Sequence, residues 1–142
     1  METEIKYYTL EFMVRIFCAI LFIFQGYDKI FVVKLEGVRQ TFYSETDKRN
    51  IPRFFVNFLA AYTSYVELLA GIFLLLGLFK TYALIGLGID LILVGASFSY
   101  MQAMWDMKYV FPRLVLVALL LVLPNSWEFL SLDKLIQTYL IK

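Results

Sequence analysis

Residues 54–79 read FFVNFLAAYTSYVELLAGIFLLLGLF, and this run contains a single charged residue, Glu67. A helix of this length rises about 39 Å at ~1.5 Å per residue, enough to cross the ~30 Å hydrocarbon core of a bilayer. Comparable apolar runs precede and follow it, and the four runs are residues 9–32, 54–79, 82–104 and 109–124. They predict an all-α integral membrane protein, an antiparallel four-helix transmembrane bundle whose fourth helix is the shortest.

The composition of the whole chain favours the same class. Of 142 residues, 61% are apolar and 18% are charged, whereas soluble domains contain about 25% charged residues. The surroundings of this chain are therefore expected to be a lipid bilayer. A formal net charge of +1 gives no reason to expect a nucleic-acid partner. The chain has no histidine and one cysteine, Cys18, so the usual ligands of haem and zinc are missing and we expect no metal site.

The segments between and after the predicted spans complete a single transmembrane domain over residues 1–142. Residues 33–53 carry basic and aromatic side chains and predict an interfacial segment on the membrane surface. Pro124 ends the fourth span, and residues 130–140 predict a short C-terminal tail helix. Eight basic residues fall on the side of residues 33–53 and four on the side of the termini. The positive-inside rule therefore places the interfacial segment in the cytoplasm.

Three ionisable residues lie inside predicted spans and away from their ends: Arg15, Glu67 and Asp90. An unpaired charge at such a position costs at least ~2.5 kcal/mol on insertion scales. Each of the three also lies on a helix stripe that contains small residues, which permit close packing in lipid. We therefore predict one connected buried cluster. Because it holds one cation and two carboxyl groups, one carboxyl should be protonated, and we assign the proton to Glu67 as the deepest.

Two neighbouring residues leave alternatives open. Glu11 lies four residues before Arg15, a spacing that allows an ion pair on one helix that only fixes the bundle. Lys29 lies near the opposite end of the first span, where its side chain is expected to reach toward the lipid headgroups. We take Arg15, Glu67, Asp90 and Lys29 as the candidate ligand-binding or buried polar residues, and we assign no catalytic residue.

Two stretches of the chain resemble the DoxX family. Residues 15–29, RIFCAILFIFQGYDK, have its first-helix spacing of Arg-x10-Gly-x2-Lys, and residues 67–79, ELLAGIFLLLGLF, have its second-helix spacing of Glu-x3-Gly-x5-Gly. Asn50-Ile51-Pro52 stands where many members have Gly-x-Pro, so the glycine of that motif is absent here. The resemblance covers about residues 11–100.

The resemblance implies a four-helix protein of the bacterial cytoplasmic (inner) membrane with a quinone-linked redox role. Relatives in the family include the small subunit of thiosulfate:quinone oxidoreductase and a methylamine-utilisation membrane protein. It nominates Arg15, Lys29 and Glu67 as shared functional positions. The chain lacks the paired cysteines that some thiol-redox relatives carry, which counts against disulfide exchange.

Three functions remain open from the sequence. The first is an accessory or quinone-linked component of a larger bacterial membrane complex, with no covalent cofactor, quinone as a bound cofactor, and partner subunits that supply the electrons. The second is a structural or assembly anchor without catalysis. The third is a small-solute or proton carrier, which the lack of an inverted repeat disfavours.

Overall fold

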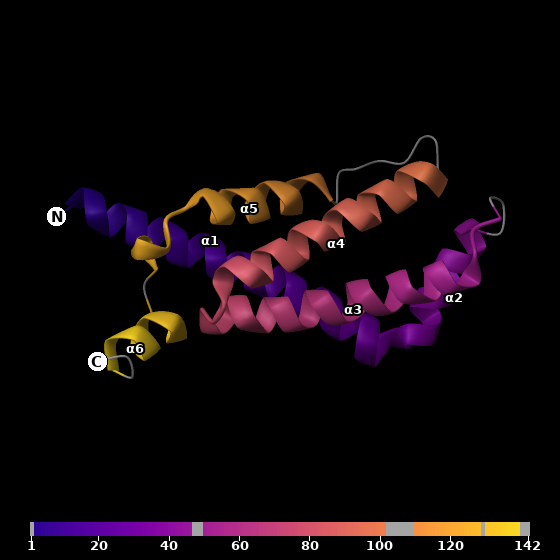
Figure 1. The fold of residues 1–142 in the computed structure, drawn as a ribbon, viewed down its shortest axis with the longest axis horizontal. Coiled ribbons are helices and arrows are strands. Elements are labelled where there is room, and N and C mark those ends of the chain that lie inside the picture. The colour runs from indigo at the N-terminus through magenta and orange to yellow at the C-terminus, as the bar shows by residue number, and fades with distance from the viewer. Residues whose placement is uncertain (1, 47–49, 102–109, 129, 140–142) are drawn as a thin grey trace.

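The computed structural model describes residues 2–46, 50–101, 110–128 and 130–139, and every regular element within these ranges is a helix (Figure 1). In chain order the elements are α1 (Glu2–Tyr27), the π-helical turn η1 (Asp28–Val32), α2 (Lys34–Thr46), α3 (Arg53–Leu76), α4 (Lys80–Met101), α5 (Phe111–Val122), the 3₁₀ turn η4 (Asn125–Trp127) and α6 (Leu132–Tyr139).

Three helical segments are long and apolar enough to cross a membrane. They are Glu4–Val32, Arg53–Leu76 and Lys80–Tyr100, so the prediction of an all-helical membrane protein is confirmed. Helix α5 has 12 residues, which gives a length of ~18 Å, less than the hydrocarbon thickness. The predicted end of the third span at residue 104, the predicted start of the fourth at 109 and the predicted end of the tail helix at 140 lie outside the described residues.

Gly77 ends α3 three residues before the boundary predicted from hydropathy. Its φ is +64°, its N–H donates to the Leu74 carbonyl at 3.1 Å, and the next N–H, of Leu78, donates to the Phe73 carbonyl at 2.8 Å. This pair of bonds is the usual helix stop built on a left-handed residue, for which glycine has no steric penalty. An apolar run continues through such a stop, so hydropathy alone overextends the helix.

Helices α1 and α3 form the most extensive contact between elements and run antiparallel to each other. Two glycines allow their backbones to approach. A Cβ on Gly71 would lie 2.9 Å from the backbone nitrogen of Ile23, and a Cβ on Gly26 would overlap the backbone of Leu68. These contacts fix the register of the pair, with Gly26 level with Leu68 and Ile23 level with Gly71.

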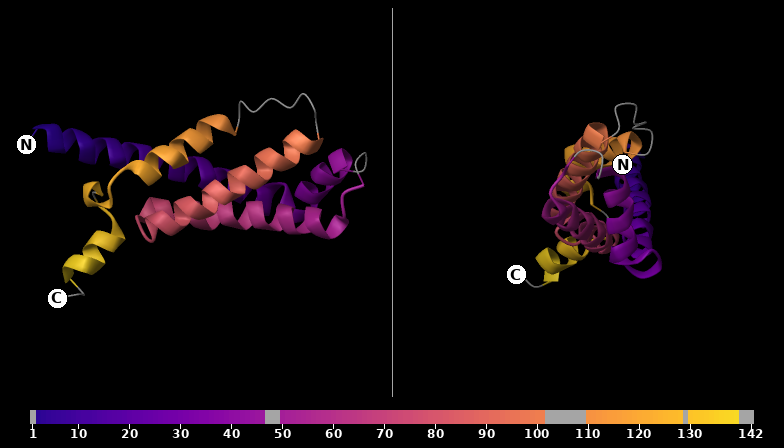
Figure 2. Two further views of the ribbon diagram at one scale, coloured as in Figure 1. Left: turned by 45° about the horizontal axis from the view of Figure 1, so that its top comes forward. Right: turned by 90° about the vertical axis from the view of Figure 1, so that its right-hand side faces the viewer.

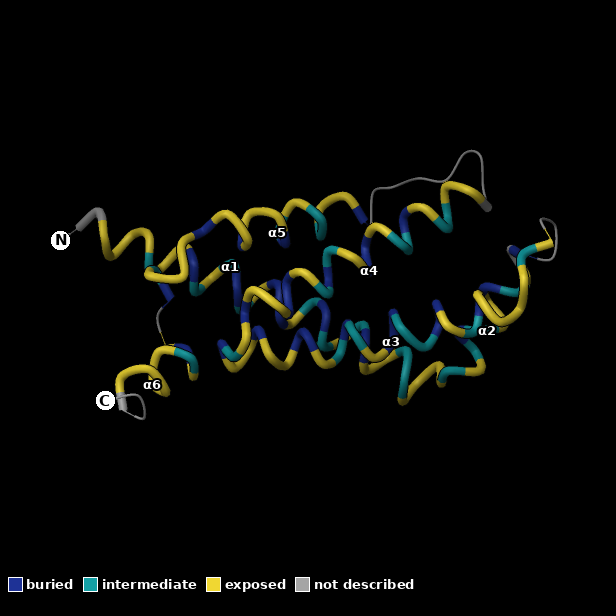
Figure 3. Tube along the Cα trace, viewed as in Figure 1, coloured by how far each residue is buried: buried dark blue, intermediate teal, exposed yellow. Residues whose placement is uncertain are grey.

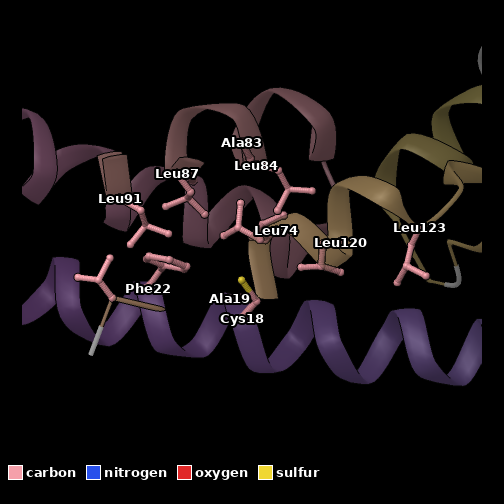
Figure 4. Close-up of a cluster of buried hydrophobic side chains, with 13 residues drawn as sticks. Cys18, Ala19, Phe22, Leu74, Ala83, Leu84, Leu87, Leu91, Leu120 and Leu123 are labelled. Carbon is pink, nitrogen blue, oxygen red and sulfur yellow. The ribbon is translucent and has the colours of Figure 1, made fainter. Parts of the chain in front are cut away.

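A buried apolar cluster joins α1, α3, α4 and α5 (Figure 4). In the figure, Phe22 points from α1 toward Leu87 and Leu91 of α4, while Leu120 enters from α5. Helix α5 is thus packed into the core although it is short. The buried members are Cys18, Ala19, Phe22, Ala70, Leu74, Ala83, Leu84, Leu87, Leu91, Val110, Val117, Leu120 and Leu123.

The outward faces of the same helices are apolar and exposed (Figure 3). Phe24 on α1 is 64% exposed and Ile92 on α4 is 63% exposed. Continuous apolar surface of this kind is unfavourable in water and matches the acyl chains of a bilayer. The distribution of burial therefore agrees with three membrane-crossing helices.

The segment predicted to lie on the membrane surface contains helix α2. The N–H of Val33 donates to the Asp28 carbonyl at 2.8 Å, which closes a π-helical turn, and Lys34 has a positive φ of 63°. The chain reverses there, and α2 packs on the start of α3 through Phe42 and Val56. Figure 2 (left) shows α2 at the opposite end of the molecule from α6 and from both termini.

Helix α6 lies against the turn between α3 and α4. The N–H of Asp133 donates to the Gly77 carbonyl at 3.2 Å, and Asp133 Oδ2 accepts a hydrogen bond from the Phe79 N–H at 2.7 Å. Phe79 has a φ of +48°, so this bond holds a residue in an unfavourable conformation. The tail is thereby attached to the end of the helix pair.

Candidate functional site

The buried charges form two separate clusters, one toward each end of α1. The arginine cluster consists of Glu11, Arg15, Lys80 and Glu128, and the lysine cluster consists of Lys29, Thr63, Glu67 and Asp90.

The arginine cluster connects four parts of the chain. Arg15 Nε lies 3.2 Å from Glu11 Oε1 on the same helix. Lys80 Nζ, at the start of α4, lies 3.3 Å from Glu11 Oε1 and 3.1 Å from Glu128 Oε1, which follows η4. All four side chains are almost completely buried. Two cations and two carboxylates balance, so this cluster has no excess charge.

The C-terminal end of α3 provides further acceptors for the same arginine. Arg15 Nη1 donates to the Leu74 carbonyl at 2.9 Å, and the last carbonyls of a helix have no partner within the helix. A cation at this end is also favoured by the helix dipole. Arg15 therefore links α1 to the C-terminal end of α3, which is a structural role.

The lysine cluster is centred on one short ion pair. Lys29 Nζ lies 2.6 Å from Glu67 Oε2 and donates to Thr63 Oγ1 at 3.0 Å. Thr63 in turn donates to Glu67 Oε1 at 3.5 Å. Lys29 belongs to the π-helical turn η1, an irregularity that occurs frequently at functional sites. The Glu67 side chain is 3% exposed, whereas that of Lys29 is 28% exposed, so the pair can be reached from outside the bundle.

Asp90 is the unsatisfied member of the lysine cluster. It is 0% exposed, and neither carboxyl oxygen has a hydrogen-bond partner among the described residues. The charged groups that act on it are Glu67 of α3, Lys29 of η1 and Arg113 of α5, and Thr63 is its polar neighbour. Burial of a polar group without partners is unfavourable. Glu67 Oε2 also has no hydrogen-bond partner in the described part of the chain, but it has the ammonium group of Lys29 at 2.6 Å. Asp90 is therefore the carboxyl group of the lysine cluster for which the described residues provide no close ion pair.

An apolar pocket of ≈ 230 Å³ lies beside the lysine cluster, on the side of α2. Leu59 and Leu93 line it, and they lie one helical turn from Thr63 and Asp90 respectively. Its wall is almost entirely apolar and includes the rings of Phe42, Phe55 and Tyr100. The residues of the lysine cluster do not line the pocket themselves, and Leu59 and Leu93 separate it from Thr63 and Asp90.

The family model DoxX matches residues 10–100, well over half of the chain. The chain belongs to the DoxX family. Neither the comparison with curated proteins nor that with solved structures gives a match. The matched segment of this DoxX protein contains the whole lysine cluster and the whole arginine cluster except Glu128.

The prediction of one cluster joining Arg15, Glu67 and Asp90 is wrong for this DoxX protein. Glu67 pairs with Lys29 instead, and Arg15 pairs with Glu11 in the way that the alternative allowed. The reason is the helix register. Glu67 is adjacent to Leu68 and so is level with Gly26, eleven residues beyond Arg15 or ~16 Å along α1. The span boundaries predicted from hydropathy place Arg15 and Glu67 at more similar depths in the membrane.

The structure also corrects the role expected for Lys29. Its side chain bends inward to an acidic partner instead of reaching only toward headgroups. Glu67 is that partner, with the cation at 2.6 Å, and the extra proton predicted for Glu67 stays a prediction. The sequence reasoning missed Thr63, Lys80 and Glu128. Thr63 could have been found, since it lies four residues before Glu67 on the same helix face.

Proposed function

We propose that this DoxX protein is a quinone-linked accessory subunit of a larger complex in the bacterial cytoplasmic membrane, and that the lysine cluster is its ligand site.

In this proposal α5 completes an antiparallel four-helix transmembrane bundle. Its packing against α1 and α4 in the common core supports this arrangement, and a short span can be accommodated by local thinning of the bilayer.

The observation that carries the proposal is Asp90, a fully buried carboxyl group with no hydrogen-bond partner among the described residues. Within the lysine cluster one cation, Lys29, faces two carboxyl groups, and Arg113 of α5 is the weakest of the charges that act on Asp90. An uncompensated charge is avoided if the cluster holds one additional proton. A protonated carboxyl is a hydrogen-bond donor. Asp90 can therefore hold a proton next to a neutral ligand.

The residues present fit a quinone. The apolar pocket has room for part of a ring, and Lys29 and Asp90 supply donors suited to carbonyl oxygens. A bound quinone would supply two-electron, two-proton redox chemistry. The chain contributes proton exchange at the Asp90 carboxyl and orientation by Lys29. With no histidine and with its one cysteine buried, the chain is expected to receive electrons from a partner subunit.

Quinone titration of the purified protein in lipid nanodiscs tests this proposal. Asp90→Asn keeps the size of the side chain but cannot release a proton, and Lys29→Met removes the ammonium group. We expect Lys29→Met to weaken binding roughly tenfold or more, the effect of losing a hydrogen bond from a charged group. Asp90→Asn keeps an N–H donor, so we expect it to bind quinone but to lose the pH dependence of binding that proton exchange at Asp90 would give. Glu36→Gln, at an exposed position on α2, is the control. If the native protein and the three variants bind quinone equally, or if the native protein binds none, the proposed quinone site is excluded.

A structural anchor without catalysis is the second candidate, and the arginine cluster favours it. That cluster joins α1, α3, α4 and the segment after η4 through fully buried ion pairs. If anchoring is the only function, Asp90→Asn and Lys29→Met will leave co-purification of partner subunits unchanged and no quinone will be retained.

A further inference from the structure

A polar pocket of ≈ 360 Å³ lies at the end of the molecule that carries both termini, between the start of α4, η4 and α6. We call it the terminal pocket. Its charged lining consists of Lys80, Glu128, Asp133 and Lys134. It lies at the opposite end of the helices from α2 and from the apolar pocket beside the lysine cluster, so the proposed quinone role does not use it.

An open apolar groove of ≈ 400 Å³ continues from the terminal pocket along α3 and α4. Phe79 and Tyr82 line both spaces. The floor of the groove contains the small residues Ala70, Ala83 and Gly86, so it is recessed between larger side chains. One elongated ligand could occupy both spaces without a break.

The two spaces lie at different membrane depths. The terminal pocket surrounds the first residues of the α4 span, which begins at Lys80, and is therefore at the level of the lipid headgroups. The groove extends to Gly86 and Val66 within the spans, at the level of the acyl chains. Helix α6 carries exposed Leu132 and Leu135 beside polar residues, a pattern typical of interfacial helices. The ligand therefore has a polar head and an apolar tail.

The charges of the terminal pocket indicate which head it has. Two cations and two carboxylates line it, so its net charge is zero. Lys80 is already paired with two carboxylates, which leaves Lys134 as the cation available to a phosphate. Lys134 Nζ donates to the Glu128 carbonyl at 3.0 Å, and an ammonium group has three donors. Asp133 is the more accessible of the two carboxylates.

We propose that the terminal pocket and its groove bind one zwitterionic phospholipid with a primary ammonium headgroup, of the phosphatidylethanolamine class. Lys134 binds the phosphate, Asp133 accepts from the ammonium, and one acyl chain lies in the groove. A glycerol headgroup presents the same phosphate to Lys134 but has no ammonium group for Asp133, which stays uncompensated. A choline headgroup has no N–H to donate.

Native mass spectrometry of the full-length protein tests this site. The protein is released from nanodiscs containing equal parts of phosphatidylethanolamine, phosphatidylglycerol and phosphatidylcholine. We expect one retained phosphatidylethanolamine per chain. Lys134→Glu should reduce its retention roughly tenfold, the size expected for loss of a charge-assisted hydrogen bond. Lys6→Glu, a matched change at an exposed lysine on the same end of the molecule, should leave retention unchanged.

A second variant tests the groove separately from the headgroup contacts. A Cβ on Gly86 would be 3.7 Å from Val66 Cγ1, an ordinary contact, and Gly86 lines the open groove. We therefore expect Gly86→Leu to fold with its side chain in the groove. Its melting temperature should stay near that of the native protein while retention of phosphatidylethanolamine falls. Equal retention of the three lipids, or retention that neither Lys134→Glu nor Gly86→Leu lowers, would show ordinary boundary lipid and overturn the proposal.

Discussion

Lys29 and Glu67 form a 2.6 Å ion pair in which only the lysine is partly exposed. Removing one partner of such a pair leaves the other charge without compensation, whereas apolar replacement of both is often tolerated. We expect Glu67→Met to destabilise the protein by about 3 kcal/mol and the double variant Lys29→Met, Glu67→Met to recover most of that loss. Thermal or denaturant unfolding in detergent measures both.

The exposed pair on α2 provides the matched control for that experiment. Arg39 Nη1 lies 3.5 Å from Glu36 Oε2, and the Glu36 side chain is 65% exposed. Glu36→Met should change stability by no more than ~0.5 kcal/mol, because exposed pairs contribute little. A double variant of the buried pair as unstable as Glu67→Met alone would show that Glu67 acts through Thr63 or Asp90 and not through Lys29.

The sequence indicates at this scale which residues are unusual but not which residues they pair with. Arg15, Glu67 and Asp90 are identifiable because charge is rare inside apolar runs. The partner of each depends on the register of two helices from different parts of the chain, and a shift of a few residues exchanges one partner for another. Contacts within one helix can be foreseen from spacing, as for the Glu11–Arg15 ion pair and the Thr63–Glu67 hydrogen bond.

At the level of elements, Gly71 determines how closely α1 and α3 pack. A Cβ there would lie 2.9 Å from the backbone nitrogen of Ile23, and backbone cannot move aside as a side chain can. Gly71→Leu should therefore separate the helices and destabilise the protein by about 1 to 3 kcal/mol, the range for overpacked cores. Gly86→Ala is the control, because its Cβ meets only ordinary contact. Equal melting temperatures for both variants would contradict this packing.

Long apolar helices are the elements that sequence identifies best, because each of α1, α3 and α4 has the length and hydropathy that a bilayer requires. Their ends and the shorter elements are harder to find. The stop at Gly77 depends on a left-handed residue, and the π-helical turn at Asp28–Val32 has no hydropathy signal. The twelve-residue helix α5 cannot be assigned as a span by length alone.

Considered as a whole, the molecule has its arginine cluster and terminal pocket at one end and α2 with the apolar pocket at the other. If α5 crosses the bilayer, both termini lie on one side and α2 on the opposite side. If α5 does not cross, the chain stays on the side of α2 after α4, and α6 lies on that side too. The turn between α3 and α4 is on the opposite side, so the contact of Asp133 with Gly77 and Phe79 could not form in the membrane. That contact therefore favours four spans.

Cysteine labelling measures this topology directly. Cys18 is fully buried and can be replaced by alanine to remove background. Single cysteines are then placed at exposed positions by Lys6→Cys, Gln137→Cys and Ser44→Cys. With an impermeant maleimide on right-side-out vesicles, we expect Lys6→Cys and Gln137→Cys to react at once, and Ser44→Cys only after permeabilisation, because the excess of basic residues retains the α2 side in the cytoplasm. If Gln137→Cys and Ser44→Cys are labelled under the same condition, α5 does not cross the membrane. If Ser44→Cys reacts at once and the other two variants react only after permeabilisation, the four spans remain and only the orientation of the protein is reversed.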